Sequence, residues 1–314
     1  MTSARIARVA LAAALSACAV VGCSAPAPAP SARPSFPAPT TTAPPSASAA
    51  PTPTDITADL DALETEFDAR VGVSALDTET GRSVEYRAEE RFGYASTLKV
   101  FAAAELLREV PPEEREARVV WTQEEVDAAG YSPVTSEHLD GGLTVAELAE
   151  AAVRESDNTA MNLVLDRIGG PAGLDAGLAA LGDETTDVVS NEPSLNEVDA
   201  GGTRDTTTPA AFTAALDALL QPRNLAPDDL ATLLDWMSGN ATGDALIRAG
   251  APADWVVRDK SGGAGGIRND IALVTPPGRA PIVVTVLTEK NDRAAEYDDE
   301  LVARVAEVVI AALD

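Results

Sequence analysis

The stretch Arg70 to Asp77 (RVGVSALD) decides the fold, because it predicts a strand close to the start of the region that can fold. Ser83 to Tyr86 follows after the turn-rich Thr78-Glu79-Thr80-Gly81, so the two segments predict an antiparallel hairpin. Strand patterns return only after about Gly239, in three further segments: Trp255 to Asp259, Ile267 to Thr275 and Pro281 to Thr288. We therefore expect one antiparallel five-stranded sheet built from both ends of residues 55–314.

The sequence between these strands predicts helices. Thr97 to Val110 is rich in Ala and Leu and stops at Pro111-Pro112. A capping box (Thr144-Val145-Ala146-Glu147), Thr208-Pro209 and Pro227 mark later helix starts, and a last helix is expected from Ala294 to Leu313. The expected fold is α+β, of the α/β sandwich type. A sheet domain (55–95 and 239–314) carries an inserted all-helical domain (96–238), and the active site is expected in the cleft between them.

The N-terminal segment predicts an export signal. Arg5 and Arg8 precede an apolar run from Val9 to Gly22 that is short for a membrane span. Two lipobox-like tetrads in this segment end at Cys18 and Cys23. We favour lipidation at Cys23, because polar Ser24 and a proline tract follow it directly; ordinary cleavage without a lipid is the alternative.

Residues 23–54 are expected to form an extended, disordered tether. Their composition is dominated by Pro, Ala, Ser and Thr, and such a segment buries too little apolar surface to offset the entropy of ordering it. We therefore expect a protein that is exported and either anchored by its lipid to the outer face of the cytoplasmic membrane or released. No later apolar run is long enough to cross a bilayer.

The composition excludes several classes of chemistry. The chain has a formal net charge of −27, a single histidine (His138) and two cysteines, both in the N-terminal apolar segment. This inventory excludes a zinc cluster and a disulfide framework, and a Ser-His-Asp triad would have to use His138. If the protein is an enzyme, we therefore expect its base to be a carboxylate or a lysine. An acidic surface repels nucleic acids and anionic lipids. We expect no cofactor, no metal and a monomer.

Three short patterns lie at predicted element ends facing the cleft. In Ser96-Thr97-Leu98-Lys99 the serine and lysine are one helical turn apart and project on the same side. Ser156-Asp157-Asn158 lies between two predicted helices, and Lys260-Ser261-Gly262 ends a predicted strand. Each pattern alone has an ordinary structural explanation, such as a helix cap or a hairpin turn. What distinguishes them is that all three occur together, in this order, and that they contain two of the three lysines of the chain.

The three patterns resemble the signature of class A β-lactamases and penicillin-binding proteins. Glu192-Pro193-Ser194-Leu195-Asn196-Glu197 narrows the resemblance to class A serine β-lactamases. Three further stretches are also similar to that family: Tyr131-Ser132-Pro133-Val134-Thr135, Ile168-Gly169-Gly170-Pro171 and Asp235-Trp236-Met237. The resemblance covers essentially all of residues 55–314 and implies a hydrolase that opens penicillins and cephalosporins and confers β-lactam resistance.

The resemblance implies a role for each matching residue. Ser96 corresponds to the nucleophile, Glu192 to the base that activates the deacylating water, and Asn196 to its partner in positioning that water. Ser156 would pass a proton to the lactam nitrogen, and either Lys99 or Glu192 would accept the serine proton. The resemblance also implies a substrate-binding set that comprises Asn158, Lys260, Ser261, Gly263, Arg268 and Tyr131. It gives no role to His138 or Lys290.

Two departures from the family pattern affect these expectations. The turn between Lys260 and Arg268 is about one residue shorter than in well-known relatives, which bears on the placement of Arg268. Ser190 stands where many relatives carry an arginine that pairs with the residue matching Asp205. Without that pair we expect Asp205 to find Arg204 or backbone donors, and the loop around Glu192 to be looser.

Two alternative functions remain at this point. A D,D-peptidase or penicillin-binding protein shares the three patterns but hardly deacylates, and Glu192 with Asn196 argues against it. A tethered lipoprotein that only binds β-lactams is the other alternative.

Overall fold

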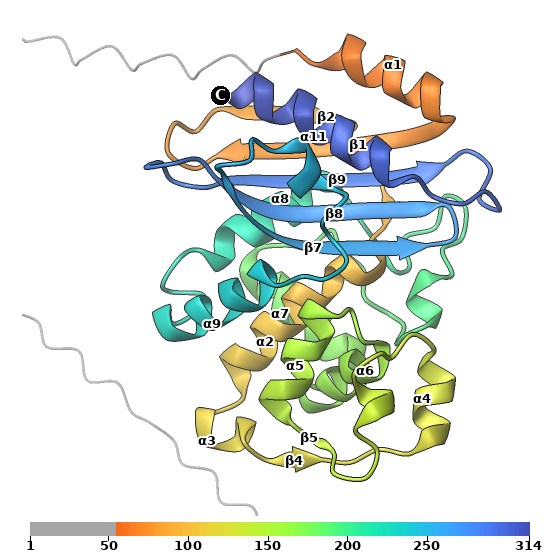
Figure 1. The fold of residues 1–314 in the computed structure, drawn as a ribbon, viewed down its shortest axis with the longest axis vertical. Helices are drawn as coiled ribbons and strands as arrows, with labels where there is room; N and C mark the ends of the chain where they lie inside the picture. The colour runs from red at the N-terminus through yellow and green to blue at the C-terminus, as the bar shows by residue number, and fades with distance from the viewer. Residues whose placement is uncertain (1–54) are drawn as a thin grey trace, which may run out of the picture. The chain divides into compact units, whose positions relative to one another are not determined.

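A five-stranded antiparallel sheet forms the centre of the described part of the chain, residues 55–314 of the computed structural model (Figure 1). Its strand order is β2-β1-β9-β8-β7. The strands are β1 (Ala69–Asp77), β2 (Ser83–Tyr86), β7 (Val256–Ala264), β8 (Ile267–Thr275) and β9 (Ile282–Lys290). The expected sheet built from both ends of the folded region is therefore confirmed, with β1 and β9 joining the two ends.

The predictions for the N-terminal segment lie outside the described residues. These are the export signal at 1–22, lipidation at Cys18 or Cys23, and the tether at 23–54. Within residues 55–314, no helix combines the length and the apolar character that a bilayer span requires.

Two layers of helices cover the sheet (Figure 1). Helices α1 (Thr57–Phe67), α10 (Ile247–Gly250) and α11 (Asp299–Leu313) pack on one face, where Leu60, Val305 and Val309 join Val71 and Val284 in one apolar core. The other helices lie on the opposite side: α2 (Lys99–Glu109), α3 (Pro112–Arg115), α4 (Gln123–Ala129), α5 (Val145–Arg154), α6 (Asn158–Arg167), α7 (Gly170–Leu181), α8 (Pro209–Leu219) and α9 (Pro227–Ser238).

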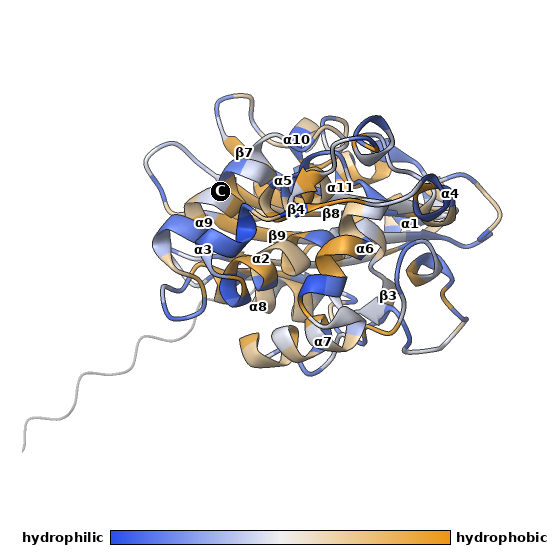
Figure 2. Cartoon of the chain, turned by 90° about the horizontal axis from the view of Figure 1, so that it is seen from below, coloured by the Kyte–Doolittle hydropathy of each residue, from blue (hydrophilic) through white to orange (hydrophobic). Residues whose placement is uncertain are grey.

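The second apolar core lies among these helices and continues onto the sheet. Phe101 of α2 and Phe212 of α8 pack with ring centroids 4.8 Å apart. Ile271 and Leu273 of β8 belong to the same cluster of buried side chains. Figure 2 shows hydrophobic residues concentrated on β8 and β9 of the sheet and on α2 of the helical layer. Helix α2 therefore starts against the sheet and runs away from it through the centre of the helical layer.

Local sequence signals explain most helix starts. Thr144 and Glu147 form the predicted capping box at α5, and Thr208 caps α8, which begins at Pro209. Helix α9 begins at Pro227 as predicted. Helix α11 begins at Asp299 and not at Ala294, because the Asp298 side chain accepts the Glu300 N–H and sets the start there.

Three features differ from the sequence-based picture. Helix α1 was not anticipated. Helix α8 falls within the stretch expected to be a separate helical domain, but it packs directly on β1 and β9. Strand β7 continues through Lys260-Ser261-Gly262 to Ala264, so only Gly265 and Gly266 form the turn to β8.

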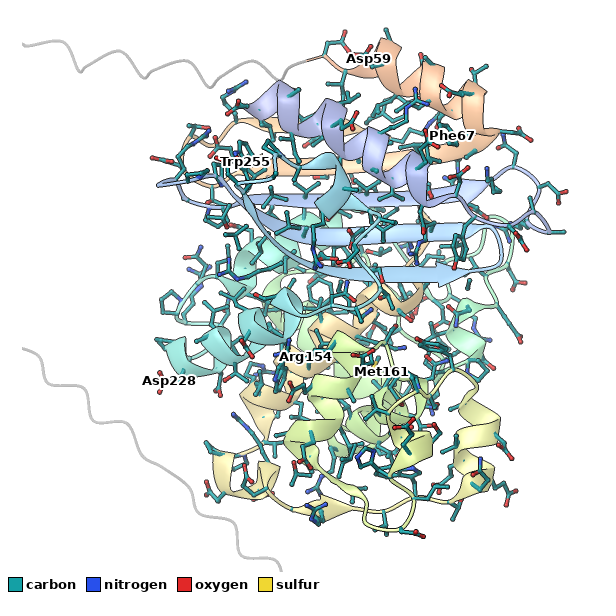
Figure 3. All side chains as sticks on the ribbon, in the orientation of Figure 1. Asp59, Phe67, Arg154, Met161, Asp228 and Trp255 are labelled. Carbon is teal, nitrogen blue, oxygen red and sulfur yellow. The ribbon has the colours of Figure 1, made fainter. Side chains whose placement is uncertain are left out.

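Charged side chains tie neighbouring elements together at the periphery. Arg154 at the end of α5, which is labelled in Figure 3, donates to Asp235 of α9 at 2.6 Å. Lys290 at the end of β9 donates to the Phe67 carbonyl of α1 at 2.8 Å. His138 is exposed, and its Nδ1 lies 2.9 Å from the Val134 carbonyl. These contacts account for His138 and Lys290 structurally.

Candidate active site

Ser96 lies in a 3₁₀ turn, Ala95–Leu98 (η1), that leads directly into α2. Ala95 has a positive φ of 46°, a conformation that costs energy for a residue with a Cβ and that occurs often at functional sites. The Asn269 side chain of β8 donates to the carbonyls of Gly93 and Tyr94, at 2.8 and 3.2 Å. The turn that carries Ser96 is therefore held against the sheet.

Lys99 is the centre of the hydrogen-bond network. Its ammonium nitrogen lies 3.0 Å from Ser96 Oγ, 2.7 Å from the Ser156 carbonyl and 2.6 Å from Asn158 Oδ1. It also lies 2.9 Å from Glu192 Oε1, and both side chains of this ion pair are fully buried. The predicted nucleophile, lysine and general base are thus in direct contact.

Burial lowers the pKa of Lys99 from that of an exposed lysine, although the charge of Glu192 opposes this shift. A buried lysine that loses its proton more readily can accept one from a neighbouring hydroxyl. Arginine, which stays charged, could not do so.

Ser156 lies between the two buried lysines. Its hydroxyl accepts from Lys99 Nζ at 3.4 Å and from Lys260 Nζ at 3.2 Å. Ser156 also has a positive φ, at 57°. Burial, followed by the nearby charge of Lys99, lowers the pKa of Lys260 to about 7. A proton can therefore move between either lysine and the Ser156 hydroxyl.

Glu192 is held from two sides. Asn162 of α6 makes a reciprocal pair of hydrogen bonds with the Glu192 main chain, each 2.9 Å long. Asn196 donates to Glu192 Oε2 at 2.8 Å, and Glu192 Oε1 lies 3.4 Å from Ser96 Oγ. Asn196 Oδ1 is buried, and no hydrogen-bond partner for it occurs in the described structure. An amide acceptor beside a carboxylate suits a bound water.

The segment that carries Glu192 spans residues 188–205, between the bridged residues Asp187 and Thr206, and is called the Glu192 loop below. Asp205 closes its neck. Asp205 Oδ1 accepts from the Val189 and Ser190 backbone N–H groups, both at 3.0 Å, and from the Tyr94 hydroxyl at 2.8 Å. Backbone donors and a tyrosine thus take the place of the arginine partner; Arg204 donates to Ser190 Oγ instead.

Strand β7 approaches the nucleophile turn closely at Gly262. A Cβ atom at Gly262 would lie 3.0 Å from the Thr97 nitrogen and 3.1 Å from the Ser96 nitrogen, so only glycine fits without movement. Strand β7 is the edge of the sheet, and alternate N–H groups on an outer edge have no partner strand. Gly263 is the next residue after Gly262 on this outer edge of β7, which faces Ser96.

A cleft of about 580 Å³ lies above these groups. The residues that line it include, of the predicted site, Ser96, Tyr131, Ser156, Asn158, Asn196, Ser261, Gly263 and Arg268. Lys99, Glu192 and Lys260 are buried beneath its floor, with 0, 5 and 0% of their surface exposed. The structure therefore brings together all of the site residues predicted within residues 55–314.

Arg268 lies at one end of this cleft despite the short turn. It pairs with Gly263 in the β7–β8 register. Its Nε donates to Asp299 Oδ1 at 2.6 Å, its Nη2 donates to the Thr242 carbonyl at 3.3 Å, and its guanidinium lies 4.8 Å from the Tyr297 ring centroid. Tyr131 is 57% exposed on the cleft wall.

Sequence reasoning missed four residues of the site. Thr242, whose hydroxyl lies 2.5 Å from Ser261 Oγ, and Tyr297 and Asp299 beside Arg268 belong to no motif. Asn162 follows Asn158 by one helical turn, and that spacing could have indicated a second amide facing the site. No group of His, Cys, Asp and Glu in residues 55–314 is arranged to hold a metal ion.

Known proteins match this chain over its whole folded part. The model of the Beta-lactamase enzyme family matches residues 55–313. A β-lactamase of Bacillus amyloliquefaciens is 49% identical over 249 residues, which cover 79% of this chain and 81% of that protein. A β-lactamase of Amycolatopsis lactamdurans is 48% identical over 252 residues, covering 80% and 83% of the two chains.

Solved structures give the same match. A class A β-lactamase from Clostridium kluyveri aligns with a TM-score of 0.79 at 42% sequence identity, over 82% of this chain and 97% of that one. A β-lactamase from Streptomyces albus G aligns with a TM-score of 0.79 at 40% identity, over 81% and 97%. The matches thus extend across the sheet, the helices and the cleft.

Proposed function

The chain belongs to the class A β-lactamase family and hydrolyses β-lactams, and from this premise we propose that Ser96 is its nucleophile and Glu192 its deacylating base. One observation carries the proposal: the Glu192 carboxylate contacts Ser96, Lys99 and Asn196 at once. A D,D-peptidase would need the serine and lysines but not a carboxylate and an amide facing the ester bond.

Acylation begins when Ser96 Oγ attacks the lactam carbonyl and loses its proton. Lys99 at 3.0 Å is the nearest acceptor, and its lowered pKa favours the neutral amine that can take the proton. Glu192 at 3.4 Å is the second acceptor, directly or through a water. Because Lys99 also contacts Glu192, a proton accepted by one group can pass to the other.

Ser156 completes the proton transfer. The lactam C–N bond breaks as the nitrogen takes the proton of the Ser156 hydroxyl, which Lys99 Nζ replenishes from 3.4 Å. Lys260 Nζ, 3.2 Å away, donates to the same oxygen and stabilises it while it is proton-poor. The net result is the transfer of one proton from Ser96 to the leaving nitrogen by relay, and the products are an ester at Ser96 and a free amine.

Deacylation requires a water beside the ester. Glu192 Oε2 is oriented by Asn196 Nδ2, and Asn196 Oδ1 is a buried acceptor that can hold the second hydrogen of that water. Glu192 takes one proton as the water oxygen adds to the ester carbonyl. When the carbonyl re-forms and the bond to Ser96 Oγ breaks, that proton passes to Ser96 Oγ directly or through Lys99, so Ser96 and Glu192 are both regenerated. The two hydrogen bonds of Asn162 fix the Glu192 main chain from which the carboxylate projects.

The oxyanion of both steps is proposed to accept from the backbone N–H groups of Ser96 and Gly263. The close approach of β7 at Gly262 supports this pairing, since it fixes the distance between the strand and the turn. Loss of one such donor typically costs about 10²–10³ in rate.

The substrate carboxylate is proposed to bind Ser261 and Arg268, with Lys260 supplying charge from beneath the floor. Thr242 and Tyr297 orient the serine hydroxyl and the guanidinium. Asn158 would hold the side-chain amide of the substrate and Tyr131 the entrance wall. We propose that penicillins and cephalosporins both bind in this way.

We also propose that the protein is exported and held at the outer face of the cytoplasmic membrane by a lipid on Cys23, and that it acts as a monomer. The sequence around Cys23 supports the anchor. Mass spectrometry of the mature N-terminus tests it: an acyl mass on Cys23 supports the anchor, and a mature chain that begins beyond Cys23 rejects it.

Hydrolysis of a chromogenic cephalosporin by Ser96→Ala tests the central proposal. Turnover should vanish while the variant stays folded. Ser136→Ala is the matched control, because Ser136 is exposed and lies outside the cleft; it should keep wild-type turnover. Hydrolysis by Ser96→Ala at the wild-type rate would reject Ser96 as the nucleophile.

A further inference from the structure

The far side of the Glu192 loop is only lightly supported. A hollow of about 710 Å³ separates the loop from the β7–β8 turn and the end of β9, and it is lined by Asn196, Val198, Gly266 and Arg293 among others. The hydrogen bonds of Asn162 at Glu192 and the neck at Asp205 hold the two ends of the loop. Its middle, residues 197–202, needs a separate support.

Val198 provides the attachment point. Its carbonyl accepts a hydrogen bond from Arg293 Nη1 at 2.5 Å. Within the described structure, this is the only hydrogen bond that ties residues 197–202 to an element outside the loop. The Val198 side chain packs on Gly93, where an added Cβ would lie 2.8 Å from Val198 Cγ2. Val198 is thus held through its main chain by Arg293 and through its side chain by Gly93.

Arg293 is itself anchored to the sheet. Its Nη2 lies 2.6 Å from Glu289 Oε1 at the end of β9. Glu289 Oε2 accepts from Arg70 Nη2 of β1 at 3.0 Å, and only 12% of the Glu289 side chain is exposed. Arg70 in turn lies over the Phe92 ring at 3.8 Å. The chain of contacts therefore runs from two sheet strands through Arg293 to Val198.

We propose that Arg293 is a positioning residue for deacylation, acting through the Val198 carbonyl to hold Asn196 and the water site. The inference rests on the proposed role of Glu192. Asn196 is two residues from Val198, and all of its hydrogen bonds in the described structure go to Glu192 and Pro193 of the same loop, so release of Val198 lets this part of the loop move. No hydrogen bond or ion pair in the described structure joins Arg293 or Val198 to Ser96, Lys99 or β7, so we expect acylation to be left intact.

Arg293→Ala and Arg293→Lys in the full chain test the proposal, with a chromogenic cephalosporin as substrate. In Arg293→Ala the deacylation rate should fall by about 10-fold, since a displacement of about 1 Å at a reacting group can cost up to about 10²-fold. The acylation rate constant should change by less than about 2-fold. Amides of residues 196–203 should exchange faster. Arg293→Lys should recover part of the loss, because an amine can donate to Val198 or Glu289 but lacks the fork that reaches both.

Arg304→Ala is the matched control. Arg304 is also a partly exposed arginine in an ion pair, with Glu66, and it joins α11 to α1 far from the loop. It should change neither step. Equal losses in acylation and deacylation for Arg293→Ala, or unchanged deacylation, would overturn the proposed role of Arg293. A failure of the proposed function would show separately, as the absence of a trapped acyl-enzyme in Glu192→Ala.

Discussion

The carboxylate of Glu192 and the ammonium of Lys99 form a fully buried ion pair, with Oε1 and Nζ 2.9 Å apart. The same ammonium lies 3.0 Å from Ser96 Oγ. Removing one member of a buried pair leaves the other charge without compensation, which is costly. A neutral Lys99 avoids this cost, so loss of Glu192 should lower the pKa of Lys99 further and leave it able to accept the Ser96 proton.

Glu192→Ala should therefore acylate and then stall. We expect deacylation to fall by about 10³-fold, within the range for loss of a general base, while acylation persists through Lys99. Intact-mass spectrometry after mixing with a penicillin should reveal a long-lived adduct on Ser96.

Glu197→Ala is the control on the same loop, because Glu197 is exposed and carries no role in the site. It should show no adduct at steady state. Rapid turnover by Glu192→Ala would contradict the assignment of Glu192, and loss of acylation as well would make Glu192 the base for both steps.

Lys260 should give kcat/KM an alkaline limb. Its pKa in the free enzyme is lowered to about 7 by burial and by Lys99. The protonated form supplies positive charge beneath the site of the substrate carboxylate, so kcat/KM should fall as the pH rises through this value. Bound substrate adds a negative charge that raises the pKa of Lys260, so kcat should hold to higher pH.

Lys260→Arg separates this limb from the titration of Lys99. A guanidinium stays charged at every accessible pH, so the decline above pH 7 should shift to higher pH even if the absolute rate is lower. If kcat/KM of Lys260→Arg declines at the same pH as that of the wild type, the alkaline limb belongs to another group.

The short motifs located the site because catalysis demands particular side chains at fixed spacing. Ser96 and Lys99 meet because they are one helical turn apart, and the Thr144 capping box and Pro209 mark helix starts through local bonds alone. Such features depend on neighbours in the sequence, so the sequence predicts them.

Contacts between distant segments were out of reach. The Thr242 hydroxyl meets Ser261 across 19 residues, and Asp299 meets Arg268 across 31. Asp205 accepts from three donors in place of the arginine that many relatives carry at the position of Ser190. One of these donors is the Tyr94 hydroxyl, whose position depends on the whole fold. Helix α1 was missed although Leu60 and Leu63 are buried three residues apart, because its polar residues hid a short pattern.

Gly262→Ala should damage both chemical steps. The new methyl group would meet backbone atoms of Tyr94, Ser96 and Thr97 at 3.0 to 3.1 Å, and backbone cannot yield as a flexible side chain does. Movement of β7 would displace the Gly263 N–H, and we expect kcat/KM to fall by about 10²-fold. At Gly141 an added Cβ meets nothing within 4 Å, so Gly141→Ala should match wild type. Wild-type kinetics in Gly262→Ala would refute the tight approach.

Asp205 should stabilise the neck of the Glu192 loop through its three donors. Asp205→Ala leaves two backbone N–H groups and the Tyr94 hydroxyl without their acceptor. Because each buried unsatisfied donor costs about 1–3 kcal/mol, the free energy of unfolding should fall by about 3 kcal/mol or more in urea titrations.

Asp187→Ala is the matched control at the same neck. Among residues 55–314, its carboxylate accepts only one side-chain hydrogen bond, an exposed one from Thr203 at 3.1 Å, so the loss should stay below about 1 kcal/mol. Hydrogen exchange locates the effect, because in the wild type the Val189 and Ser190 amides should exchange as slowly as helix amides and residues 197–202 faster. Uniformly fast exchange across 188–205 would mean that the Asp205 donors do not replace the arginine pair, and that the whole loop, not its middle alone, is loose.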